Sequence, residues 1–70
     1  MADIQMPMNG KVIAVKVEVG ENVAEDDELV VIEAMKMELP VVATEGGTVK
    51  EIKAAVGESY QVGDVLVVLG

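Results

Sequence analysis

The chain has 70 residues, which gives room for one compact domain, residues 1–70, and for no second one. It contains neither cysteine nor histidine, so disulfide bridges and zinc sites of the usual Cys/His kind are excluded as sources of stability. Thirteen acidic residues against five lysines give a net charge of −8. With no arginine and a single aromatic residue, the chain lacks the means by which proteins bind nucleic acids.

All the predicted elements are strands, because 21 of the 70 residues are β-branched: 15 valines, 4 isoleucines and 2 threonines. The first strand covers residues 4–6 and is followed by a turn over residues 7–10. From there, residues 10–33 align with residues 47–70 at an offset of 37, with ten identities in 24 positions. About two identities are expected by chance from ordinary composition. The chain therefore consists of two copies of one β unit.

Each copy is predicted to hold a long strand, a short strand and a second long strand. Gly20 and Gly57 mark a tight turn at the same place in each copy. In the next turn Asp26 is matched by Gly63, which indicates a left-handed backbone that glycine adopts freely and aspartate tolerates. Apolar residues three apart in the first long strand, at residues 12–15 and at the matching place in the second copy, predict a bulge.

A second leading strand, residues 41–43, precedes the second copy, so the count comes to eight short strands. We expect two facing antiparallel sheets, related by a pseudo-twofold axis, with valine, isoleucine and leucine buried between them. Residues 34–39 form the crossover between the copies and have no counterpart in the repeat. The pseudo-symmetry predicts that they form a protruding hairpin at the end opposite the chain termini.

The chemistry of that hairpin is unusual for a turn. Its sequence runs through Glu33, Ala34, Met35, Lys36 and Met37. Exposed thioethers gain nothing from burial in the free protein, so we expect something to pack on the two methionines. Lys36 is expected to be exposed and suited to modification by another enzyme. The alternative is an ordinary surface lysine, with Met35 and Met37 filling a local gap.

The stretch EAMKM, residues 33–37, resembles the biotin-attachment motif of biotin carboxyl carrier domains. Residues 4–10 are similar to the opening stretch of that family, residues 17–23 to its first turn, and residues 64–66 to its closing strand. The resemblance implies the all-β biotinyl/lipoyl fold, a flattened barrel-sandwich of two four-stranded antiparallel sheets. The repeat has no insertion, so the protruding thumb of some bacterial carriers is not expected here.

The resemblance also implies a function. A biotin protein ligase would join biotin to Lys36 through an amide, and the tethered cofactor would move a carboxyl group between a biotin carboxylase and a carboxyltransferase. By the same resemblance, Met35 and Met37 contribute to recognition by the carboxylase partners, and Glu33 and Ala34 shape the hairpin. Tethering keeps a labile intermediate at high effective concentration between two sites.

Two alternatives of other kinds stay open. A lipoyl carrier shares the fold, but such domains typically have aspartate before the lysine and alanine or serine after it, so Met35 and Met37 favour biotin. An unmodified small β interaction module would instead use the hairpin as a binding epitope.

A self-contained enzyme is not expected, because the chain has Ser59 but no cysteine as a nucleophile and no histidine to act as the base. The acidic run at residues 26–28 is interpreted as a solvated turn rather than a metal site. We expect a cytoplasmic protein without direct membrane contact, since no signal peptide is visible and no apolar run approaches the ~20 residues of a membrane span. The chain is expected to be either a stand-alone carrier subunit or a domain of a longer one.

Overall fold

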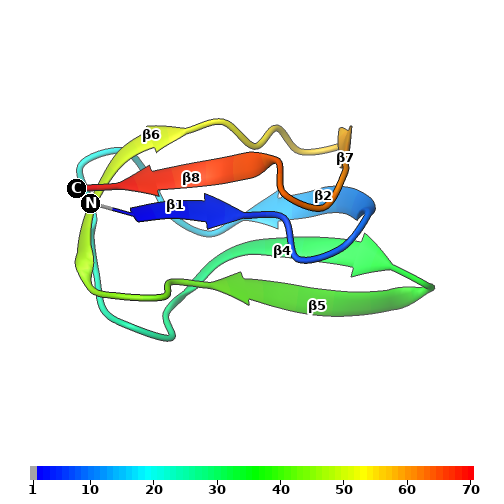
Figure 1. The fold of residues 1–70 in the computed structure, drawn as a ribbon, viewed down its shortest axis with the longest axis horizontal. Helices are drawn as coiled ribbons and strands as arrows, with labels where there is room; N and C mark the ends of the chain where they lie inside the picture. The colour runs from blue at the N-terminus through cyan, green and yellow to red at the C-terminus, as the bar shows by residue number, and fades with distance from the viewer. Residues whose placement is uncertain (1) are drawn as a thin grey trace.

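The computed structural model describes residues 2–70, and its regular elements are all strands (Figure 1). In chain order they are β1 (Ala2–Gln5), β2 (Gly10–Val15), β3 (Asn22–Val23), β4 (Glu28–Ala34), β5 (Met37–Val42), β6 (Gly47–Ile52), β7 (Ser59–Tyr60) and β8 (Val65–Leu69). The predicted number of strands is confirmed. Over residues 2–70 the chain forms no helix of the length and apolarity that crossing a bilayer requires.

The strands form two four-stranded antiparallel sheets, in the orders β1-β8-β6-β3 and β5-β4-β2-β7. The offset of 37 relates β1 to β5, β2 to β6, β3 to β7 and β4 to β8. Exchanging these partners turns one sheet order into the other, which confirms the pseudo-twofold architecture. Each sheet takes strands from both copies, so neither copy completes a sheet without the other.

The core lies between the two sheets and contains aliphatic side chains in repeat-related pairs. Each member of these pairs is at most 1% exposed: Val12 and Val49, Leu29 and Leu66, Val30 and Val67, and Ile32 and Leu69. The pairing register shifts at the predicted bulges, between Val12 and Ala14 in β2 and between Val49 and Glu51 in β6. The bulges change side-chain parity, so that each long strand keeps apolar residues on the inner face.

The predicted turns are present. Gly20 and Gly57 have φ angles of 94° and 93°, and Asp26 and Gly63 have φ angles of 73° and 93°. Asp26 therefore adopts the left-handed conformation that its match with Gly63 predicted.

The acidic run forms a hydrogen-bonded turn. The Ala24 N–H donates to Asp27 Oδ2 at 2.8 Å, and in the second copy the Gln61 N–H donates to Asp64 Oδ2 at 2.9 Å. The repeated aspartate thus satisfies a turn N–H that has no strand partner, which gives it a structural role.

The strand boundaries differ from the expected ones in one respect. β1 covers Ala2–Gln5 and β5 covers Met37–Val42, whereas the sequence predicted short leading strands over residues 4–6 and 41–43. β5 is longer because it pairs with β4 from Glu28 and Val42 up to Ala34 and Met37. The β4–β5 hairpin protrudes at the end opposite the two chain termini, as predicted (Figure 1).

Candidate functional site

The candidate site is the tip of the β4–β5 hairpin, where only Met35 and Lys36 connect the strands. Ala34 and Met37 form the last paired position of the ladder. Met35 has a φ angle of 53° and Lys36 one of 64°, so both connecting residues are left-handed. Two positive φ angles define a type I′ hairpin loop, which matches the twist of the strands that it joins.

This backbone is costly for the residues that occupy it. Type I′ loops strongly prefer Asn-Gly, because a side chain in the left-handed region costs roughly 1–2 kcal/mol per residue. Neither Met35 nor Lys36 relieves this strain. Residues held in strained backbone conformations are often found at functional sites. The hairpin tip is therefore a candidate functional site.

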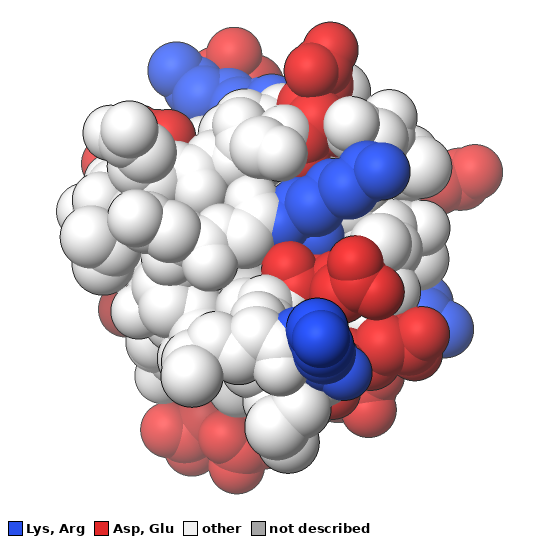
Figure 2. Space-filling model, turned by 90° about the vertical axis from the view of Figure 1, so that its right-hand side faces the viewer, with Lys and Arg blue, Asp and Glu red and all other residues white. Residues whose placement is uncertain are grey.

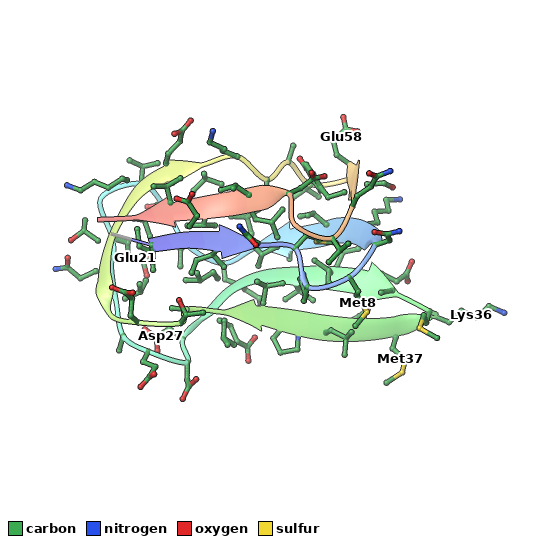
Figure 3. The ribbon with its side chains drawn as sticks, in the orientation of Figure 1. Met8, Glu21, Asp27, Lys36, Met37 and Glu58 are labelled. Carbon is green, nitrogen blue, oxygen red and sulfur yellow. The ribbon has the colours of Figure 1, made fainter. Side chains whose placement is uncertain are left out.

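The tip side chains point into solvent. Met35 is 88% exposed and Met37 60% exposed, and Lys36 extends away from the body of the domain (Figure 3). The alternative in which the two methionines fill a local gap is therefore wrong. Lys36 is exposed at the tip of the hairpin, where the side chain is accessible to another protein.

The other two predicted hairpin residues differ in role. Ala34 is buried, whereas Glu33 is exposed and pairs across the hairpin with Glu38. A Cβ atom on Gly10 would lie 2.7 Å from the Glu33 carbonyl oxygen and 3.2 Å from Ala34 Cβ. The glycine thus lets β2 pack directly against the base of the hairpin. Sequence reasoning placed Gly10 in a turn and did not predict this contact.

Relieving the strained turn is expected to stabilise the domain. Replacing Met35 with asparagine and Lys36 with glycine would supply the residues that a type I′ loop prefers, and should raise the free energy of unfolding by about 1–2 kcal/mol. Urea denaturation followed by circular dichroism measures this change. The control is Val19→Asn, which introduces the same asparagine directly before Gly20 in a turn of a different type and should not stabilise. If the double variant at the tip is no more stable than the parent, the inference that the turn is strained is wrong.

Comparison with known proteins agrees with this geometry. The family model described as "Biotin-requiring enzyme" matches residues 2–69, and the chain belongs to that family, whose cofactor is biotin. The biotin/lipoyl attachment protein of Bacillus subtilis (strain 168) is 38% identical over 66 residues, which are 94% of this chain and 90% of that protein. The resemblance in the sequence is thereby confirmed.

Larger proteins contain similar segments. The mitochondrial propionyl-CoA carboxylase alpha chain of Homo sapiens is 46% identical over 94% of this chain, which spans only 9% of that protein. The biotin carboxyl carrier protein of Streptococcus mutans is 41% identical over 90% of this chain and 48% of that protein. The crystal structure of the Kluyveromyces lactis urea carboxylase superposes with a TM-score of 0.93 at 30% identity, covering 99% of this chain and 6% of that one. The predicted fold class is confirmed.

Proposed function

We propose that this chain is a biotin carboxyl carrier and that Lys36 is the residue to which biotin is attached. The observation that carries the proposal is the exposed Lys36 on a strained two-residue loop in a chain of the biotin-requiring family. None of the other four lysines lies at a hairpin tip, since Lys11 and Lys50 are within strands and Lys16 and Lys53 follow them. An amide between the biotin carboxyl group and Lys36 Nζ fits this position, because nothing in the domain surrounds the amine.

The role of the chain in that chemistry is to hold the biotin and present it to partner enzymes. Biotin, when bound, supplies a ureido nitrogen that accepts and releases a carboxyl group. The rigid β4–β5 ladder fixes the root of the Lys36 side chain, and the side chain itself supplies the flexible part of the tether. Partner sites would then be reached without free diffusion of the cofactor.

The partners follow from the same proposal. A biotin protein ligase would modify Lys36, a biotin carboxylase would load the tethered group, and a carboxyltransferase would unload it. The last two partners are supported by relatives named as carboxylases. This chain covers only 9% and 6% of the length of two of them, so their chains are more than ten times longer than this one. Met35 and Met37 are proposed to contact these partners, because both are exposed apolar side chains beside Lys36.

The proposal is tested by co-expression with a biotin protein ligase. We expect the intact mass to rise by one biotin per chain and avidin to capture the product. Parallel co-expression with a lipoate ligase should leave the mass unchanged. Lipoylation would favour the lipoyl alternative. Binding to a biotin carboxylase that is equally tight before and after biotin attachment would favour the unmodified interaction module.

A further inference from the structure

The internal repeat places two equivalent pairs of loops at opposite ends of the domain. At the hairpin end, the Met6 N–H donates to the Asp64 carbonyl oxygen at 2.7 Å, and the Gly63 N–H donates to the Met6 carbonyl oxygen at 3.0 Å. At the end of the termini, Ala43 takes the place of Met6. Its N–H donates to the Asp27 carbonyl oxygen at 2.9 Å, and its carbonyl oxygen accepts from the Asp26 N–H at 2.9 Å. The two loop pairs therefore have the same backbone connections.

Their side chains differ in chemistry. By the offset of 37, Met8 corresponds to Glu45 and Val62 corresponds to Glu25. Glu25 and Glu45 are exposed, and so are Met8 at 37% and Val62 at 64%. The fold accommodates a carboxylate at both positions, as the other end of the domain shows. Folding therefore does not require the exposed apolar side chains at the hairpin end, and such side chains are typical of interaction sites.

Exposed apolar residues are not found at the hairpin end alone. Val19 and Val56 correspond to each other in the repeat, and each is 63% exposed. The asymmetry is confined to the loops that hold Met8 and Val62, which lie at the same end as Lys36. It is this coincidence that links them to the site.

The apolar residues form one continuous face beside the hairpin. Pro7, Met8, Asn9, Met35 and Val62 line a shallow hollow. Figure 3 shows Met8 at the hairpin end of the molecule, together with Lys36 and Met37. Figure 2, which views this end directly, shows an uncharged expanse on one side and lysine and acidic side chains on the other. A protein of net charge −8 thus keeps one side of its functional end free of charge.

The face is also held in place. The Val62 N–H donates to Asn9 Oδ1 at 2.8 Å, which joins two loops 53 residues apart in the sequence. Asn9 corresponds to Gly46 at the other end, which has no side chain to make such a bond. Gly10 brings the loop of Pro7, Met8 and Asn9 against the base of the hairpin. A rigid face loses less conformational entropy on binding than a mobile one.

We propose that Met8, Met35 and Val62 form the docking face for the biotin carboxylase, and that the carboxylase meets it with an uncharged rim around its active-site entrance. The inference rests on the proposed function. An uncharged face lets this acidic domain approach closely without burying an unpaired carboxylate, which is costly.

Geometry favours the carboxylase over the ligase. The ligase acts on Lys36 Nζ itself, so its contacts centre on the hairpin tip. The carboxylase acts at the far end of the extended arm. While the Lys36 side chain and its biotin extend into the carboxylase active site, the surface of the carrier around the hairpin contacts the rim of that active site. Met8 and Val62, which lie beside the hairpin and not on its tip, belong to that surface.

The variants Met8→Glu and Val62→Glu test the proposal, because each copies the residue at the equivalent position of the other end. We expect both to be fully biotinylated by the ligase. Their second-order rate constants for carboxylation by a biotin carboxylase should fall about tenfold or more. The matched control is Val19→Glu, which adds the same charge at a valine of nearly the same exposure, 63% against 64%. Val19 lies in the turn beside Glu21, at the end of the termini (Figure 3), and its variant should react as the parent does.

Each other outcome overturns the proposal in a recognisable way. Unchanged rate constants for carboxylation in Val62→Glu and Met8→Glu would show that the carboxylase does not use this face. If the same variants then lost only the transfer of the carboxyl group by a carboxyltransferase, the face would be assigned to that enzyme. An equal fall in Val19→Glu would assign the effect to net charge. Loss of biotin attachment in Val62→Glu would assign the face to the ligase. A parent that sediments as a dimer while Val62→Glu sediments as a monomer would assign it to a second copy. Failure of the parent itself to accept biotin would instead contradict the role of Lys36.

Discussion

Replacing Lys36 with arginine is expected to abolish biotin attachment completely. The guanidinium group stays protonated at any pH that the protein survives, so it has no free electron pair with which to form an amide. The change keeps the positive charge and a long side chain at an exposed position, so the stability of the domain should change by less than about 0.5 kcal/mol. Intact mass after co-expression with a biotin protein ligase, together with avidin capture, measures the loss.

Lys11→Arg is the matched control for that experiment. Lys11 is exposed and lies at the same end of the domain, in a strand that pairs with the hairpin through Glu33. It should accept one biotin per chain, as the parent does. Residual biotin in Lys36→Arg, or loss of biotin in Lys11→Arg, would contradict the assignment of Lys36.

Replacing either Leu29 or Leu66 with alanine is expected to remove most of the stability of the domain. Both side chains are fully buried between the sheets, and truncating a buried leucine costs about 2–5 kcal/mol. A domain of this size without disulfides or metal rarely has more than ~3–5 kcal/mol of stability. Because the two residues are equivalent in the repeat, their costs should be similar. Thermal and urea denaturation, followed by circular dichroism, give both values.

The control for the core variants is Val19→Ala, at a side chain that is 63% exposed, which should change the stability by less than about 0.5 kcal/mol. A large cost at one leucine and a small cost at the other would show that the two sheets contribute unequally. That result would contradict a core shared evenly between the copies.

The two largest effects act on different levels of the molecule. Lys36→Arg is expected to remove the proposed attachment site and leave the fold, whereas Leu66→Ala is expected to remove the fold that presents Lys36. The separation is expected because Lys36 lies outside the packed region, on a strained two-residue loop. A carrier needs this arrangement, since its reactive group must enter the active sites of other proteins.

The architecture could be predicted from the sequence because the chain contains an internal repeat. Turn residues such as Gly20 and Gly57, and the match of Asp26 with Gly63, encode local backbone geometry that does not depend on distant parts of the chain. Ten identities at one offset then required the same unit twice, and two such units bury their apolar faces only against each other. The unrepeated crossover, with Lys36 at its centre, followed from the same comparison.

The shape and the surroundings of the site depend on how the strands pair and could not be predicted from the sequence. Neither Met35 nor Lys36 signals a left-handed backbone, so the two-residue turn and the full length of β5 emerge only when β4 and β5 pair to their ends. Met8 and Val62 are far apart in the sequence and meet beside the hairpin because β1 pairs with β8. Sequence spacing encodes turns and strand faces, whereas contacts between distant loops depend on how the strands pair in space.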